Sequence, residues 1–189
     1  MIRLCTGAAA ALLLSGCAAA PIQYLTLVPP AGQTAISSGG AAGAPAVSVT
    51  VPSQVDQPEL IVRQPDGSMA LLESERWIAP LADEIRIALS LSLARQWEPG
   101  PAGTVRVQVD VQRFDSVPGQ YALIDAVWTL TAGGSAPQQV SCRSSIRIPV
   151  GNGYPALAKG HQAAIEQLAS QIAKQAVKLG AADTACGAP

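Results

Sequence analysis

Charged side chains are scarce in this chain. Only 13% of its 189 residues are charged, about half of the roughly 25% usual in soluble domains. The 12 basic and 13 acidic residues give a formal net charge of −1, and Lys or Arg never occurs in a run. Nucleic-acid binding depends on a concentrated positive surface. We therefore expect no nucleic-acid partner.

Histidine is almost absent, which limits the chemistry that the chain can perform. Hydrolytic triads and most zinc sites need histidine, and the single one here is His161. It stands one helical turn from Leu157 and from Ile165, so we interpret it as the flank of a core-facing helix surface. The acidic pair Asp83 and Glu84 is expected on the outer face of a helix. The sequence predicts no catalytic, metal or cofactor site, and hence no enzyme.

One short motif resembles a dinucleotide-binding fingerprint. Residues 151–156, GNGYPA, match G-x-G-x-x-A between a predicted strand and a predicted helix. A dinucleotide fold needs a further parallel strand that ends in an acidic residue about 20 positions on. The helix occupies that position here. We interpret the segment as a glycine turn, with Pro155 in the first turn of the helix.

A hydrophobic run long enough to cross a bilayer is also missing at the N-terminus. Arg3 and the apolar stretch Leu4–Leu14 form an export signal, which is shorter than the roughly 20 residues of a membrane-spanning helix. The residues that follow, Leu14-Ser15-Gly16-Cys17, resemble a bacterial lipobox. Residues 1–16 are then a lipoprotein signal peptide, and the thiol of Cys17 carries a thioether-linked diacylglyceryl group. The alternative is a plain signal peptide with an unmodified cysteine.

The residue after the cysteine bears on the destination of the lipoprotein. Ala18 is not the aspartate that typically retains lipoproteins in the inner membrane. We therefore expect a lipid anchor, including palmitate-type acyl chains, in the outer membrane, with the domain facing the periplasm.

Four cysteines occur in the chain, and the lipobox interpretation accounts for two of them. Cys5 leaves with the signal and Cys17 is lipidated, so Cys142 and Cys186 remain. In an oxidising periplasm two remaining thiols favour a disulfide. The alternative is a buried free Cys142 and a free Cys186 in the tail.

Hydrophobic periodicity predicts one domain of the α+β class, in which one mixed, largely antiparallel sheet packs against two long helices. Residues 17–45 form the lipidated N-terminus, a first strand and a Gly/Pro-rich loop, and residues 46–189 form the main domain. The helices are expected over Glu75–Trp97 and Tyr154–Leu179, with Pro80 in the first turn of the earlier one. The strands are expected over Ile22–Val28, Ala46–Val51, Glu59–Arg63, Met69–Leu72, Thr104–Asp115, Tyr121–Thr131 and Gln138–Val150.

The order of these segments resembles a known family, the ABC-type transport auxiliary lipoproteins (PqiC-like, also called YmbA-like). The matching pieces are the lipobox, IQYLTLVP, VSVTVPSQVDQPELIVRQ, ESERWIAPLADEIRIALSLSL, VRVQVDVQRFD, GQYALIDAVWTL and YPALAKGHQAAIEQLASQIA. One departure is QVDQP at residues 54–58, where the family often has a Tyr-Leu-Asp-Arg-Pro-like turn. Gln57 stands where that turn has its arginine, so a role carried by the arginine is not expected in this chain.

The resemblance implies a non-catalytic envelope component. It implies that the chain works with an MCE-domain protein and with an ABC permease and its ATPase. Such systems move phospholipid or other apolar molecules between membranes. The resemblance also implies a homo-oligomer at the outer membrane that binds the MCE partner. The alternative is a structural or assembly lipoprotein of the envelope that has no lipid path.

Overall fold

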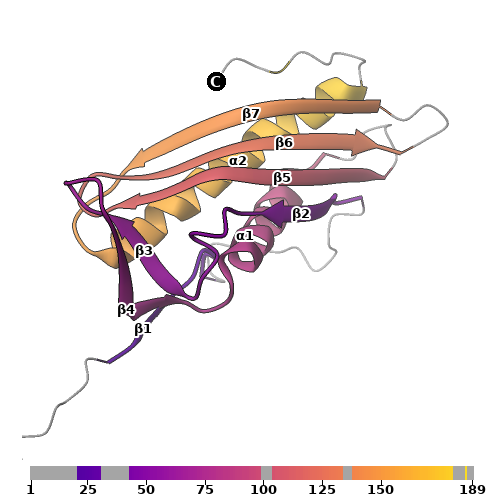
Figure 1. The fold of residues 1–189 in the computed structure, drawn as a ribbon. Coiled ribbons are helices and arrows are strands. Elements are labelled where there is room, and N and C mark those ends of the chain that lie inside the picture. Colours follow the sequence, from indigo (N-terminus) through magenta and orange to yellow (C-terminus); the bar gives the residue numbers. More distant parts are fainter. Residues whose placement is uncertain (1–20, 31–42, 99–103, 134–137, 181–185, 187–189) are drawn as a thin grey trace, which may run out of the picture.

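The computed structural model describes residues 21–30, 43–98, 104–133, 138–180 and 186, and in these residues seven strands and two helices form an α+β fold (Figure 1). The predicted signal peptide, Cys17 and most of the predicted Gly/Pro-rich loop lie outside the described residues. In chain order the elements are β1 (Gln23–Leu25), β2 (Ala46–Thr50), β3 (Glu59–Arg63), β4 (Met69–Trp77), α1 (Leu81–Gln96), β5 (Val105–Val117), β6 (Tyr121–Ala132), β7 (Gln138–Pro149) and α2 (Tyr154–Gly180).

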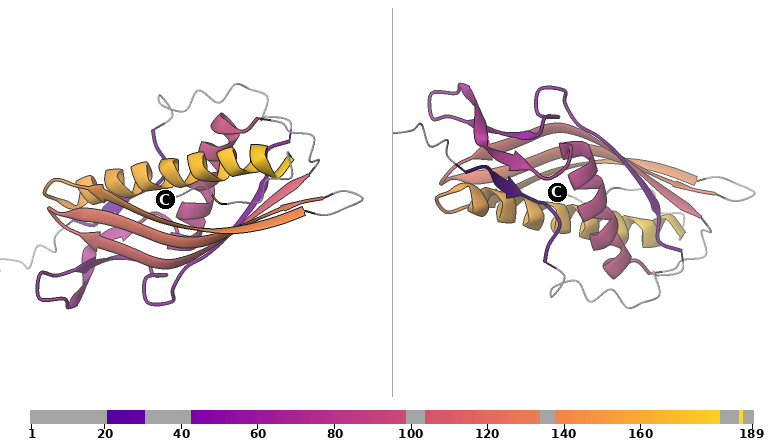
Figure 2. Two further views of the ribbon diagram at one scale, coloured as in Figure 1. Left: turned by 90° about the horizontal axis from the view of Figure 1, so that it is seen from above. Right: turned by 90° about the horizontal axis from the view of Figure 1, so that it is seen from below.

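The larger sheet has the strand order β2-β5-β6-β7. Its last three strands form the predicted antiparallel meander, and β2 joins β5 in parallel. The valines of β5 point inward and the polar residues between them point outward, as their alternation predicts. Both helices lie on one face of this sheet (Figure 2), with α2 against β6 and β7 and α1 beside β2.

The smaller sheet corrects the prediction of a single sheet. β1, β4 and β3 pair in the order β1-β4-β3 and form a separate unit at one end of the larger sheet (Figure 1). β3 and β4 are an antiparallel hairpin, whereas β1 is parallel to β4. Arg63 in β3 forms an ion pair at 3.0 Å with Asp115 in β5 and so connects the two sheets.

The first helix begins later than predicted. Residues 75–77 extend β4, because Trp77 pairs with Leu25 and its backbone N–H donates to the carbonyl of Pro58 at 2.7 Å. Pro80 is the residue before the helix, with ψ of 140°, and not part of its first turn. Its carbonyl accepts hydrogen bonds from the N–H groups of Asp83 and Glu84. The second helix agrees with its predicted bounds to one residue.

The core lies between the helices and the larger sheet. On α2, helical spacing predicts six inward-facing residues, of which five are buried and Ala176 is half-buried; the five are Leu157, His161, Ile165, Leu168 and Ile172. Gly160 lets the helix approach the sheet closely, since a Cβ at this position would lie 2.4 Å from Cγ1 of Val150. Neither described helix combines the length and apolar character that crossing a membrane requires.

Candidate functional site

The principal candidate site from the sequence is Cys17, the predicted point of lipid attachment. Cys17 lies outside the described residues, but the chain is described from Pro21, four positions later. Residues 23–25 form β1 and pair with residues 75–77 of β4. The backbone N–H of Ile78 donates to the carbonyl of Leu25 at 3.0 Å, which continues the pairing beyond the end of β4. Residues 23–25, which follow Cys17 by six to eight positions, are therefore part of the fold.

A buried carboxylate holds the residues that follow β1. Glu84, on the first turn of α1, is 2% exposed. Its Oε2 accepts hydrogen bonds from the backbone N–H of Leu27 at 2.7 Å and from the hydroxyl of Thr26 at 2.8 Å. The helix N-terminus is a favourable place for this negative charge. From the other helix, Nε2 of Gln162 donates to the carbonyl of Thr26 at 2.9 Å. We call these contacts the N-terminal clamp.

The clamp corrects the prediction that both residues of the acidic pair face solvent. Asp83 does so, with a side chain that is 52% exposed and paired with Arg86. Glu84 does not. It lies three positions after Leu81 and four before Ala88, both buried, so helical spacing places it on the inward face. That spacing was a signal in the sequence for its burial.

A groove of about 450 Å³ lies beside the clamp, between α1 and α2. Leu27, Ala88 and Ile165 supply apolar surface, while Arg95, Lys159 and Glu166 supply charge. Arg95 approaches Glu166 to 3.9 Å, which is a weak ion pair at the surface. The groove is therefore lined by both apolar and charged side chains.

His161 lies in the core, as the sequence interpretation of a core flank requires. Its ring is fully buried, stacks on Phe114 with centroids 3.8 Å apart, and contacts the Ser116 hydroxyl through Nε2 at 2.9 Å. Burial lowers its pKa to about 3, although the negative charge of Asp115 acts in the opposite direction. The imidazole is therefore neutral at physiological pH.

Ser116 and His161 resemble two members of a hydrolytic triad, a pairing that the sequence reasoning missed because 45 positions separate them. A triad needs a carboxylate on the other ring nitrogen. Nδ1 of His161 has no hydrogen-bond partner among the described residues, and the carboxylate of Asp115 is bound to Arg63 and Arg113. Ser116 is also buried, at 1% exposure. The pair thus lacks both the third group and access for a substrate.

The GNGYPA segment is a turn between β7 and α2, as interpreted from the sequence. Gly153 has φ of +88°, a conformation that favours glycine. β7 is antiparallel to its partner β6, whereas a dinucleotide fold builds this turn on parallel strands. The topology at this position is therefore not that of a dinucleotide-binding unit.

Cys142 and Cys186 are joined by a disulfide in the structure, with their Cα atoms 5.7 Å apart. Cys142 is a buried residue of β7 and stands opposite Trp128 of β6. The bond encloses 44 positions of sequence, including all of α2. It attaches Cys186 to the larger sheet.

Comparisons with known proteins identify one family and two structures with the same fold. The family model for the ABC-type transport auxiliary lipoprotein component matches residues 25–173. A crystal structure described only as an uncharacterized protein has a TM-score of 0.61 and 19% identity, over 70% of this chain and 90% of that chain. Protein XCC0632 from Xanthomonas campestris, of family DUF330, has a TM-score of 0.57 and 15% identity, over 87% and 98%. Comparison with curated proteins gave no significant match. At these identities the two structures show a shared fold.

Proposed function

Because this chain belongs to the family of ABC-type transport auxiliary lipoprotein components, we propose that it is a non-catalytic component of an intermembrane transport system. The proposed cargo is phospholipid or another apolar molecule, and the proposed partners are an MCE-domain protein and an ABC permease with its ATPase. The chain itself binds the MCE partner, as a homo-oligomer. A surface poor in charge suits such protein contacts, since interface cores are depleted of charged residues.

The proposed location is the periplasmic face of the outer membrane. A diacylglyceryl thioether on Cys17, together with acylation of the freed amine, gives an anchor of several chains, which holds far more firmly than one chain. Ala18 in place of aspartate supports the outer membrane as the destination.

The N-terminal clamp is the structural observation that supports this proposal best. Thr26 and Leu27 are bound to both helices, so the domain begins only a few residues after the anchor. An extended chain spans at most about 3.6 Å per residue. A domain held this close to the outer membrane is suited to receive a partner that arrives from the inner membrane.

Co-purification tests the proposal. The wild-type chain is extracted from membranes in mild detergent through an affinity tag at its C-terminus, and the eluate is examined for an MCE protein and for phospholipid. Both are expected to co-purify with the wild-type chain. The Cys17→Ser variant is the control and is expected in the soluble periplasmic fraction.

Two results would contradict parts of the proposal. Retention of Cys17→Ser in the membrane would refute lipid anchoring at this cysteine. Recovery of the anchored chain with neither MCE protein nor phospholipid, under conditions that preserve other envelope complexes, would favour a structural or assembly lipoprotein without a lipid path.

A further inference from the structure

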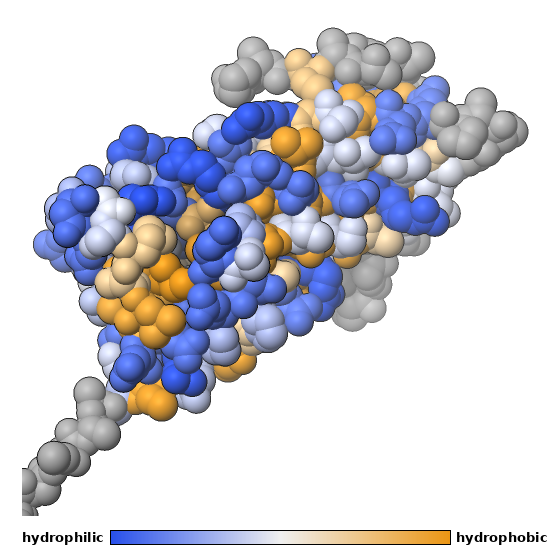
Figure 3. Space-filling view, in the orientation of Figure 1, coloured by the Kyte–Doolittle hydropathy of each residue, from blue (hydrophilic) through white to orange (hydrophobic). Residues whose placement is uncertain are grey.

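Three exposed hydrophobic side chains gather where the chain enters the fold. Ile22, Tyr24 and Ile78 are 51%, 61% and 66% exposed. The other exposed large hydrophobic residues of the described chain lie elsewhere: Met69 and Leu71 on β4, Ile87 on α1 and Val177 on α2. Figure 3 shows hydrophobic surface at the lower end of the molecule, beside the point where the chain leaves towards its N-terminus.

Strand pairing places these three side chains on the same side of the smaller sheet. Leu25 and Trp77 are paired and buried, at 6% and 3% exposure. Their neighbours Tyr24 and Ile78 therefore point to the opposite face, since side chains alternate along an extended chain. Ile22 precedes Tyr24 by two positions and shares its side. The result is a small apolar surface built from the beginning of β1 and the residue after β4.

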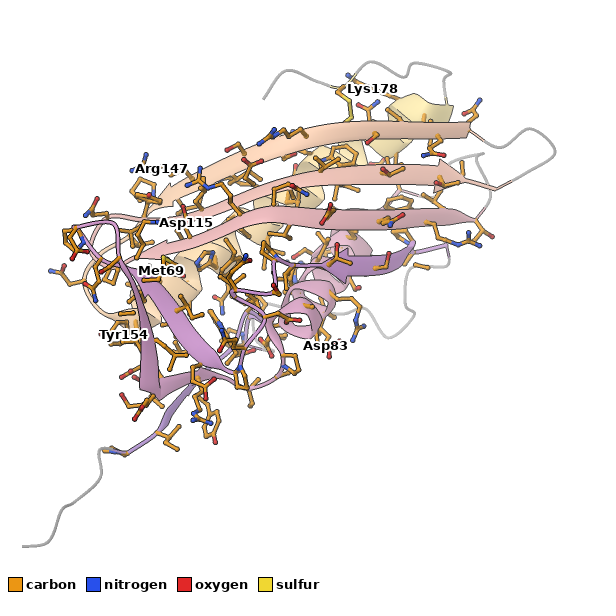
Figure 4. The ribbon with its side chains drawn as sticks, viewed as in Figure 1. Met69, Asp83, Asp115, Arg147, Tyr154 and Lys178 are labelled. Carbon is orange, nitrogen blue, oxygen red and sulfur yellow. A yellow bond between two sulfur atoms is a disulfide. The ribbon has the colours of Figure 1, made fainter. Side chains whose placement is uncertain are left out.

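The charged residues of β4 beside β1 have partners: Glu75, the register partner of Gln23, accepts a hydrogen bond from the Ser74 hydroxyl at 2.7 Å. Arg76 is the register partner of Tyr24, and its guanidinium forms an ion pair with Glu59 at 2.9 Å. Met69, which is labelled in Figure 4, and Leu71 are exposed nearer the start of β4, where the turn joins it to β3. The three residues thus expose two aliphatic side chains and one phenol with no charge of their own.

The position of the anchor decides what covers this surface. Ile22 follows Cys17 by five positions, so the two Cα atoms are at most about 18 Å apart even in a fully extended chain. Aliphatic side chains with a tyrosine at their edge are suited to the membrane interface, where the ring is apolar and the hydroxyl stays hydrated. A surface this close to the proposed acyl chains lies within reach of the bilayer that holds them.

We propose that Ile22, Tyr24 and Ile78 form a membrane-docking patch that inserts into the interface of the bilayer holding the lipid on Cys17. The proposal rests on the lipidation of Cys17 in the proposed function. Two attachments, the acyl chains and the patch, fix the orientation of the domain, whereas the acyl chains alone leave it free to rotate about its tether.

Tryptophan quenching by brominated phospholipid tests the patch directly. Tyr24→Trp is introduced into the full lipidated chain, which is reconstituted in phosphatidylcholine vesicles with bromine near the headgroup end of the acyl chains. The native tryptophans, Trp77, Trp97 and Trp128, are at most 9% exposed, and the wild-type chain gives their background. We expect the added emission to fall by about half, because an interfacial ring lies within reach of the bromine atoms.

Val177→Trp is the matched control, since Val177 is also exposed, at 56%, but lies near the far end of α2. Its added emission is expected to stay unchanged. A second variant, Tyr24→Trp with Ile78→Ser, should show clearly weaker quenching because the patch has lost one of its two aliphatic groups. Equal quenching at positions 24 and 177 would overturn the proposal and would leave the surface to a protein partner.

Mass spectrometry of the N-terminal peptide separates this test from the proposed function. If Cys17 carries its acyl groups and position 24 is not quenched, the patch is refuted while the anchor stands. If Cys17 is unmodified, the lipid anchor is refuted. The Cys17 thiol is then coupled to a maleimide phospholipid and the quenching is measured again. This second measurement still shows whether the patch contacts the bilayer.

Discussion

Replacing Glu84 by alanine should lower the free energy of unfolding by about 3 kcal/mol. Each hydrogen bond to a charged group contributes roughly 1.5–3 kcal/mol, and Glu84 accepts two. Removal also leaves the buried N–H of Leu27 without its acceptor. Part of this loss is offset because the variant no longer has to bury a carboxylate. Glu84→Gln keeps an oxygen for the N–H of Leu27, so its expected loss is about 1 kcal/mol.

Urea unfolding of the soluble Cys17→Ser chain measures this loss, with the disulfide intact in every variant. Asp83→Ala is the matched control because Asp83 is the exposed neighbour on the same helical turn, and we expect its effect to stay within about 0.5 kcal/mol. Hydrogen exchange at the Leu27 amide reports the clamp itself, and Glu84→Ala should accelerate it. If Glu84→Ala unfolds like Asp83→Ala and the Leu27 amide exchanges as slowly as in the wild type, the reasoning about the clamp is wrong.

Three further predictions concern the core. Burial holds the pKa of His161 at about 3, against 6.5 in the unfolded chain, so below pH 6.5 only the unfolded state takes up this proton. Stability should fall by about 1.4 kcal/mol per pH unit as the pH decreases from about 6 towards 3. His161→Gln should lose this part of the slope in urea titrations at pH 7 and 4.5, and an unchanged slope would contradict the assignment. Reduction of the Cys142–Cys186 bond should lower the unfolding free energy by about 4 kcal/mol in the chain-entropy treatment. Alkylation of the unreduced, denatured chain at both positions would refute the bond. Gly160→Ala should destabilise by about 1–2 kcal/mol despite better helix propensity, and Val150→Ala in the same chain should recover part of this loss in a double-mutant cycle of thermal unfolding.

Local patterns were sufficient to predict the meander of β5, β6 and β7 and the second helix. The valines of β5 alternate with polar residues, and the inward residues of α2 recur at helical spacing. Each pattern can be read from a single segment of the sequence, because each of these elements buries one continuous face. The turn at Gly119, between β5 and β6, is local too. These elements therefore needed no knowledge of distant partners.

The start of α1 could not be predicted from its own residues. Trp77, Leu81 and Ile85 are spaced by four, which fits one helix face as well as any true helix. What keeps Trp77 in a strand is its pairing with Leu25 and its hydrogen bond to Pro58. These contacts join distant parts of the chain, and the same non-local pairing separates the smaller sheet from the larger one.

In the candidate site, too, some residues could be identified from the sequence and others only from the fold. The lipobox cysteine and the pair Cys142 and Cys186 were named from the sequence, because each depends on residue type and compartment. The role of Glu84 depends on donors 57 and 58 positions away. Helical spacing shows that the residue faces inward, but only the folded chain shows what it binds.

The parallel pairing of β1 with β4 also determines how the domain responds to mechanical load. A pull on the N-terminus along β1 stretches the pairings of Gln23, Tyr24 and Leu25 at the same time, and the contacts of the N-terminal clamp lie directly behind them. Loaded in this direction, the contacts share the force and do not peel away one after another. β1 and β4 are thus arranged as a shear joint, which resists tension from the N-terminal side better than a pairing that opens one hydrogen bond at a time.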